Sequence, residues 1–145
     1  MMKPLVLLVD DEAPFVETMT KRLSKRDLKI ITAYSGEEAL ELLDKNRNTD
    51  VVILDVKMPG MNGIETLEKI RNRFPLMEVI MLTGHATVES AIEGMKLGAF
   101  DYLMKPCEIE QLMAKVQEAA KKKRDHEEKI REARVREALS AHGLE

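Results

Sequence analysis

The feature that most constrains the fold is an alternation of short apolar runs with stretches of helical periodicity, repeated five times along 145 residues. This alternation is typical of a parallel sheet wrapped by helices. The runs are apolar at nearly every position instead of every second one, as expected of strands buried on both faces. We therefore predict strands at residues 4–9, 28–33, 51–54, 77–82 and 100–103.

Helices are predicted between these strands because apolar residues recur there at three-to-four spacing. The predicted ranges are 13–26, 36–47, 63–73 and 86–97, and a fifth helix begins near Glu108. Ser35 is a candidate N-terminal cap of the second helix, and Pro75 follows the end of the third. The expected fold class is α/β, a doubly wound five-stranded parallel sheet with five helices, the last of them extended.

The C-terminal segment differs in composition from the rest of the chain. The apolar pattern of the last helix stops after Ala120, and residues 121–129 read KKKRDHEEK. No proline or glycine interrupts residues 108–142, so the helix is expected to continue. We divide the chain into a domain at residues 1–120 and a charged helical extension at residues 121–145. The KKKR run is interpreted as a solvated helix face, and the sequence leaves open whether the extension is solvated or paired with another helix.

Composition argues against several functional classes. The longest apolar runs have four or five residues, whereas a membrane-spanning helix needs roughly 20. The N-terminus lacks the pattern of a signal peptide, so a cytoplasmic location without membrane contact is expected. Residues 1–120 carry 20 acidic against 15 basic side chains, and the whole chain has only two Tyr and three Phe. Direct nucleic-acid binding is therefore not expected.

Polar residues follow four of the predicted strands. Asp10 and Asp11 follow the first strand, Asp55 the third, Thr83 the fourth and Lys105 the fifth. Ligands of doubly wound sheets bind at the carboxyl ends of the strands, so these side chains are expected to converge. Three converging carboxylates raise one another's pKa unless a cation joins them, and hard oxygen ligands suit Mg²⁺.

Asp55 is the candidate nucleophile, because it ends the most apolar strand and precedes a loop. Attack on phosphorus gives an aspartyl phosphate. Mg²⁺ on Asp11 and Asp55, with Asp10 bound directly or through water, neutralises charge, and Lys105 balances the charge that grows on the phosphoryl group. Thr83 adds a hydroxyl donor.

Four segments carry a resemblance to the receiver domains of two-component response regulators, and it covers about residues 3–120. They are LLVDDE at the first strand, DVKMPGMNG around Asp55, TGHA from Thr83 and GAFDYLMKP ending at Pro106. The resemblance implies a flavodoxin-like sheet with strand order 2-1-3-4-5. It also implies that the backbone carbonyl of Lys57 joins Asp10, Asp11 and Asp55 as Mg²⁺ ligands, and that Lys105 and Thr83 grip the phosphoryl oxygens.

Further expectations follow from the same resemblance. Tyr102 is the expected switch residue, and the output surface is the face of the fourth helix, fifth strand and fifth helix. The Lys105–Pro106 peptide resembles one that is cis in receivers. Lys57 and His85 occupy positions that influence the lifetime of the phosphoryl group. Expected partners are a histidine kinase or phosphotransfer protein and a second copy of the chain, bound through the output face or the extension.

These observations favour a phosphoacceptor switch of a two-component phosphorelay, which is no enzyme beyond catalysing its own phosphorylation and dephosphorylation. One alternative is that the chain is the receiver fragment of a longer transcriptional regulator. Another is a phosphatase with an aspartate nucleophile, but such enzymes usually carry a second acid two residues after the nucleophile, where this chain has Lys57. A constitutive scaffold is disfavoured by the complete set of site residues.

Overall fold

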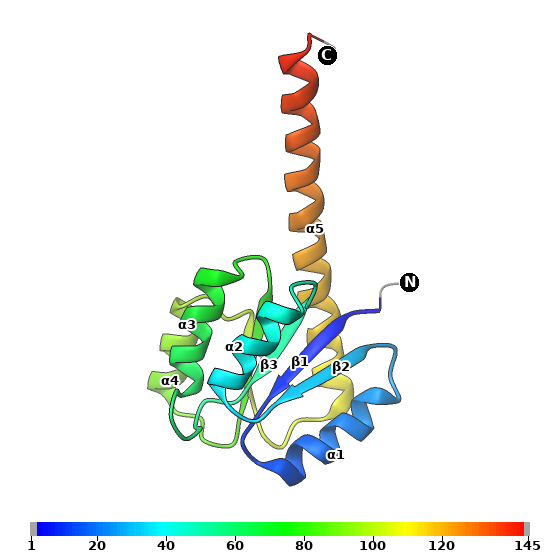
Figure 1. Cartoon of the computed structure of the whole chain (residues 1–145). Coiled ribbons are helices and arrows are strands. Elements are labelled where there is room, and N and C mark those ends of the chain that lie inside the picture. Colours follow the sequence, from blue (N-terminus) through cyan, green and yellow to red (C-terminus); the bar gives the residue numbers. More distant parts are fainter. Residues whose placement is uncertain (1–2, 144–145) are drawn as a thin grey trace.

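Five parallel strands form one sheet in the computed structural model, which describes residues 3–143 (Figure 1). The strands are β1 (Leu5–Val9), β2 (Lys29–Ala33), β3 (Val51–Leu54), β4 (Glu78–Thr83) and β5 (Asp101–Met104). Their order across the sheet is β2-β1-β3-β4-β5, so the winding reverses beside β1. The fold class and the strand order expected from the sequence are confirmed.

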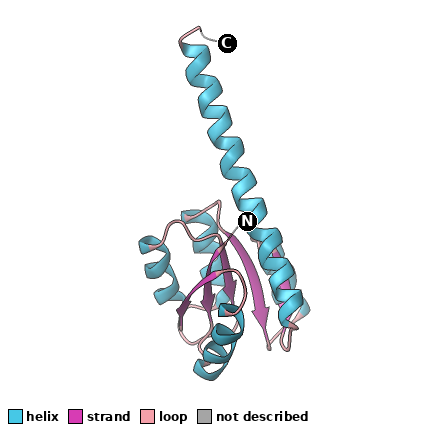
Figure 2. Cartoon of the chain, turned by 90° about the vertical axis from the view of Figure 1, so that its right-hand side faces the viewer, coloured by secondary structure: helices cyan, strands magenta, loops and turns pink. Residues whose placement is uncertain are grey.

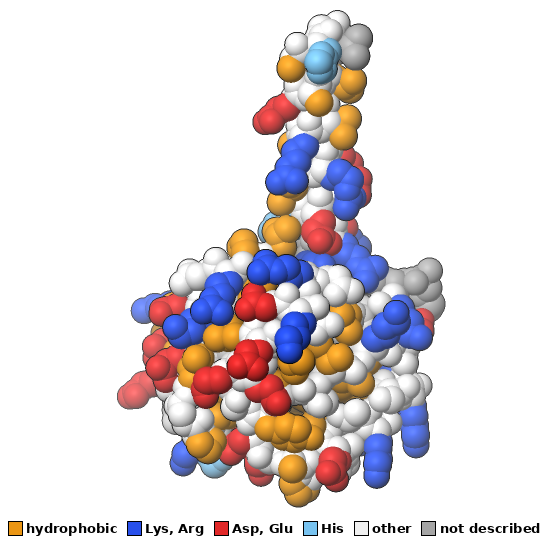
Figure 3. Space-filling view, in the orientation of Figure 1, with side chains coloured by type: hydrophobic (Ala, Val, Ile, Leu, Met, Phe, Trp, Pro, Cys, Tyr) orange, Lys and Arg blue, Asp and Glu red, His pale blue; other side chains and the backbone are white. Residues whose placement is uncertain are grey.

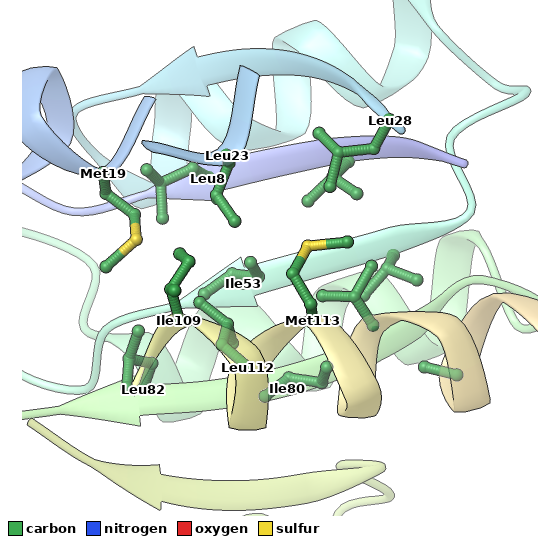
Figure 4. Close-up of a cluster of buried hydrophobic side chains, with 14 of the residues drawn as sticks. Leu8, Met19, Leu23, Leu28, Ile53, Ile80, Leu82, Ile109, Leu112 and Met113 are labelled. Atoms are coloured by element: carbon green, nitrogen blue, oxygen red, sulfur yellow. The ribbon is translucent and has the colours of Figure 1, made fainter. Parts of the chain in front are cut away.

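Helices cover both faces of the sheet, and neighbouring residues of each central strand point to opposite layers. Val6 and Leu8 of β1 belong to the apolar cluster beneath α1 (Ala13–Ser24) and α5 (Ile109–Ala141). Leu7 and Val9 belong to the opposite cluster. That second layer consists of α2 (Gly36–Lys45), α3 (Gly63–Arg73) and α4 (Val88–Lys96). Figure 4 shows the first cluster, in which Met19 and Leu23 of α1 and Leu112 of α5 pack against the sheet.

Capping interactions explain where the helix ends differ from the predicted ones. The helix predicted from residue 86 begins at Val88, because the Thr87 hydroxyl accepts a hydrogen bond from the Ser90 amide and caps it. The helix predicted to residue 47 ends at Lys45, where the side chain of Asn46 donates to the Leu42 carbonyl. Ser35 caps α2 as predicted, by accepting from the Glu38 amide.

α5 is one continuous helix that leaves the domain as a rod (Figures 1 and 2). Its predicted inward face is buried, from Ile109 to Ala120. The domain boundary predicted after residue 120 falls inside this helix and stays a prediction. The outer limits of the two predicted parts, residues 1–2 and 144–145, lie outside the described residues. The interpretation of KKKR as a solvated face is wrong for Lys123, which is 5% exposed because it pairs with a buried acid.

No helix between residues 3 and 143 has the length and apolar character needed to cross a lipid bilayer.

Candidate functional site

The sheet brings the predicted acidic residues together. Val9 of β1 pairs with Leu54 of β3, so the residues that follow these strands, Asp10 and Asp55, lie side by side at one edge. Asp10, Asp11 and Asp55 each offer a carboxylate oxygen, and these oxygens lie within 4.8 Å of one another. Asp10 and Asp55 are 1% exposed, whereas Asp11 is exposed and faces the solvent side of the group.

Asp10 is held by two hydrogen bonds. Its Oδ1 accepts from the Glu12 amide at 2.9 Å, and its Oδ2 accepts from Lys105 Nζ at 2.6 Å. Burial raises the pKa of Asp10, the nearby charge of Asp55 adds to this effect, and the two hydrogen bonds offset it only in part. Because burial makes the ionised form of Asp10 unfavourable, a further cation beside the carboxylate would stabilise that form.

Asp55 has one satisfied oxygen and one free oxygen. Its Oδ1 accepts a hydrogen bond from the following amide, that of Val56, at 2.8 Å. Its Oδ2 is buried and has no hydrogen-bond partner among the described residues. The nearest cation is Lys105, whose Nζ lies 3.9 Å from Oδ2. Since buried oxygens are rarely left unsatisfied, this atom points to a ligand or a reaction.

Lys105 is the central cation of the site. It also donates to Glu12 Oε1 at 3.3 Å, and its Nζ lies 3.9 Å from the centre of the Phe15 ring. Burial alone would lower the pKa of Lys105, but the hydrogen bond to Asp10 and the charges of Asp10 and Asp55 outweigh it and raise the pKa. The peptide between Lys105 and Pro106 is cis, as the resemblance implied.

Sequence reasoning did not identify Glu12 and Phe15 as partners of Lys105. Glu12 follows the aspartates in the segment LLVDDE, and Phe15 lies within the predicted helix at residues 13–26. No pattern in the sequence pairs residues 12 and 15 with a residue about 90 positions away, because that contact depends on where the loop after β5 brings the Lys105 side chain.

Three further predicted residues end or follow the strands β3 and β4, namely Lys57, Thr83 and His85. Thr83 ends β4, is fully buried, and accepts a hydrogen bond from the His85 amide at 3.0 Å. Lys57 and His85 are exposed and line one cleft of about 340 Å³ together with Asp11. The two positions expected to influence the phosphoryl lifetime therefore flank the acidic residues.

Tyr102 contacts α4. The residue is half-buried on β5, and its hydroxyl lies 2.6 Å from the Ser90 hydroxyl. Ser90 also belongs to the capping box at the start of α4, where it bonds with Thr87. The structure thus connects Tyr102 to the first turn of α4, a link that sequence reasoning missed because Ser90 had no distinguishing pattern.

The donor set fits a hard divalent cation. Three carboxylates converge, two of them buried, and Asp55 Oδ2 lacks a partner within residues 3–143. Oxygen-only ligands of this kind suit Mg²⁺, a hard cation that also keeps several waters, through which one of the carboxylates can be bound. The backbone carbonyl of Lys57 as a further ligand stays a prediction.

Comparisons with known proteins agree with this geometry. Residues 6–117 match the response regulator receiver domain family. Over 119 residues the chain is 35% identical to the DNA-binding transcriptional regulator NtrC of Escherichia coli, and over 111 residues it is 39% identical to the transcriptional regulatory protein CpxR of Escherichia coli. These alignments cover 82% and 77% of this chain but only 25% and 47% of the relatives, so the chain spans a quarter to about half of their length.

A solved structure gives the same result. The response regulator receiver domain protein of Clostridium thermocellum superposes with a TM-score of 0.80 at 36% identity, covering 83% of this chain and 97% of that one.

Proposed function

The chain belongs to the family of response regulator receiver domains of two-component systems, and on that premise we propose that Asp55 is its phosphoryl acceptor. The observation that carries the proposal is the state of Asp55 Oδ2, which is buried, lacks a hydrogen-bond partner within residues 3–143 and faces Lys105 at 3.9 Å. A nucleophilic oxygen needs a free lone pair, and a cation beside it neutralises the charge that arrives with the phosphoryl group.

The reaction is transfer of a phosphoryl group to a carboxylate. Asp55 Oδ2 attacks phosphorus and forms a P–O bond, while the bond from phosphorus to the donor's histidine nitrogen breaks and its electron pair stays on that nitrogen. The product is an acyl phosphate. The donor is a histidine kinase or a phosphotransfer protein, and the chain itself supplies the groups that promote both this transfer and the later hydrolysis.

A bound Mg²⁺ supplies charge neutralisation for the carboxylates and the phosphoryl oxygens. Asp10, Asp11 and Asp55 would hold it, together with the Lys57 carbonyl, and the convergence of three carboxylate oxygens within 4.8 Å supports this assignment. Lys105 and Thr83 hold the phosphoryl oxygens. The raised pKa of Lys105, in which hydrogen bonding to Asp10 outweighs burial, keeps its amine charged for this role.

Phosphorylation is proposed to move Thr83 toward the phosphoryl group and Tyr102 inward behind it. In the present structure the Tyr102 hydroxyl is bonded to Ser90, so the inward turn breaks that bond and releases the first turn of α4. The affected face is that of α4, β5 and α5. It exposes apolar side chains of a kind that a partner would cover, namely Val88, Ile92, Met95 and Met104.

A second copy of the chain is the proposed partner of this face or of the extended α5. Lys57 and His85, which line the cleft beside Asp11, are proposed to set how fast water reaches the phosphoryl group. Since the chain spans only part of its curated relatives, a receiver that controls a longer transcriptional regulator is the alternative setting for the same switch. In neither setting does this part of the chain bind nucleic acid directly.

Incubation with Mg²⁺ and acetyl phosphate, followed by intact mass spectrometry, tests the proposal. We expect addition of a single phosphate to the unaltered chain and none to the Asp55→Asn variant, whose amide is a poor nucleophile of nearly the same size. Continuous release of phosphate without accumulation of the phosphorylated chain would favour the phosphatase alternative. Phosphate retained by Asp55→Asn would place the acceptor elsewhere.

A further inference from the structure

We propose that Lys122, Lys123 and Arg124 of α5 form an ionic clamp with Asp50 and Glu78, and that this clamp fixes the direction in which the extended helix leaves the domain. These five residues, called the tail clamp, lie at the edge of the sheet opposite Asp55. Asp50 directly precedes β3 and Glu78 begins β4, whereas Asp55 directly follows β3. The proposal is independent of phosphorylation and assigns a role to the KKKR run.

Asp50 is a fixed point of the sheet edge. Its amide donates to the Leu5 carbonyl at 2.9 Å, and its carbonyl accepts from the Glu78 amide at 3.2 Å. Its side chain is also anchored, because Oδ2 accepts from the Leu5 amide at 2.9 Å. The residue is 2% exposed. Because the Asp50 carboxylate is fixed in this way, it determines the position at which side chains of α5 can bind it.

Two consecutive cations of α5 meet this carboxylate. Lys123 Nζ donates to Oδ1 at 3.1 Å, and Arg124 donates with Nε to Oδ1 at 3.2 Å and with Nη2 to Oδ2 at 3.1 Å. The two-pronged contact of a guanidinium with a carboxylate fixes orientation as well as distance. Burial alone would raise the pKa of Asp50, yet the hydrogen bonds from Arg124, Leu5 and Lys123 outweigh it and lower the pKa.

Lys122 supplies a contact on the other side of the helix. Its Nζ lies 3.8 Å from Oε2 of Glu78, which is 1% exposed and whose Oε1 has no hydrogen-bond partner within the described chain. Successive helical residues are rotated by about 100°, so Lys122 and Arg124 point to widely separated directions. Contacts on both sides resist tilting of the helix and its rotation about its own axis. Basic side chains gather where the rod leaves the domain (Figure 3).

The clamp begins where apolar packing ends. Ala119 and Ala120 are the last apolar residues of α5 in the core, and the next apolar residue, Ile130, is 39% exposed. Without the clamp the buried contacts of the helix would end at Ala120, and only the exposed neighbourhood of Leu76 and Ile130 would remain beyond it. With it, the exposed apolar residues Ile130, Val135 and Leu139 are presented in one orientation relative to the domain.

Distances between spin labels in the full chain test the clamp. Labels are attached to Lys25→Cys, directly after α1, and to Glu137→Cys on the rod, both at exposed positions, in a Cys107→Ser background. The variant Lys123→Gln with Arg124→Gln removes two charges from the clamp. The matched control, Lys121→Gln with Lys129→Gln, removes two exposed charges from the same helix. Arg124→Gln alone is a milder variant if the double variant does not fold.

We expect a narrow distance distribution in the unaltered chain and the control, and a distribution at least about twofold broader in the clamp variants. Amide exchange at residues 121–127 should accelerate by roughly tenfold or more in the clamp variants only. Phosphate uptake at Asp55 should persist, which separates this test from that of the acceptor site. A distribution that stays narrow in a folded Arg124→Gln or double variant, with unchanged exchange, would overturn the proposal.

Discussion

At the scale of single residues, the acceptor site is a balance of three acids and one cation. Lys105 lies 2.6 Å from Asp10 and 3.9 Å from Asp55. Its ammonium group therefore already neutralises part of the negative charge that would attract a divalent cation. The lysine is therefore the proposed partner of the phosphoryl group and, by its charge, a competitor of the proposed metal.

Replacing Lys105 with Met tests this dual role. We expect Mg²⁺ affinity to rise by roughly tenfold, because two unit charges a few Å apart interact by about 1–4 kcal/mol between the dielectric constants of water and of a protein surface. The rate of phosphorylation should fall, because the growing charge loses its counterion. Isothermal titration and intact mass measure the two effects, and Lys21→Met, an exposed lysine on α1, is the control. A weaker metal affinity in Lys105→Met would contradict the electrostatic argument.

Gly63 is required by close packing beside the acceptor. A Cβ at this position would lie 2.0 Å from the Asp55 carbonyl oxygen and 2.8 Å from Val56 Cα, both backbone atoms. Gly63→Ala should therefore lower the free energy of unfolding by about 2–4 kcal/mol, as overpacked sites do, and displace the acceptor loop. Urea unfolding measures this effect.

Gly94→Ala is the matched control for that substitution. Its Cβ would meet only side chains at 3.7 Å or more, at ordinary contact distance. Because alanine favours a helix over glycine, Gly94→Ala on α4 should be neutral or slightly stabilising. Equal losses in the two variants would refute the steric explanation.

At the scale of elements, α5 consists of two parts with different physical support. From Ile109 to Lys123 it contributes buried residues, whereas from residue 128 to residue 143 every side chain is exposed. An isolated helix of that length is marginal in water, so the outer part depends on the anchored part for its helical start.

Two truncations distinguish these parts. Ending the chain after Lys129 should change the free energy of unfolding by less than about 0.5 kcal/mol, since only exposed residues are removed. Ending it after Ala120 should cost about 1–3 kcal/mol, because Asp50 loses its hydrogen bonds to Lys123 and Arg124. Urea unfolding of both forms measures the difference. Equal stability of the two truncated forms would show that the clamp contributes nothing to folding.

At the scale of the whole molecule, two ionic groups occupy opposite edges of one sheet. The acids at the carboxyl ends of β1 and β3 converge with Lys105, and Asp50 at the amino end of β3 is paired with α5. In the first group the carboxylates outnumber the cations, whereas in the second group Asp50 is paired with two cations. The first is therefore suited to bind a cation, and the second to hold two elements together.

The pH dependence of stability should reflect the second group. The pKa of Asp50 in the folded chain lies below its ordinary value of 3.8, so its contribution is complete above that value and is lost as the pH falls through the folded pKa. The stability difference between the unaltered chain and Asp50→Asn should be constant from about pH 7 to pH 5 and shrink toward about pH 3. Urea unfolding across this range measures it. A difference that grows on acidification would give Asp50 the opposite sign.

The alternation of strands and helices could be predicted from the amino-acid sequence, and with it the sheet edge at which Asp10, Asp55, Thr83 and Lys105 gather. Apolar periodicity is a local property that each segment carries alone, and the position of a residue just after a buried strand fixes its edge. The strand order could be predicted only from the resemblance of the four motif segments to receiver domains, because apolar periodicity does not specify the order of strands.

The side-chain contacts between distant segments could not be predicted in this way, because they depend on the folded chain. Three such contacts join separate segments: Lys105 with Glu12 and Phe15, Tyr102 with Ser90, and Asp50 with Lys123 and Arg124. The sequence predicts that Lys123 is solvated because it lies in a charged run, and its buried partner Asp50 is 73 residues away. Such pairings depend on where packed elements bring long side chains, and that position exists only once the chain has folded.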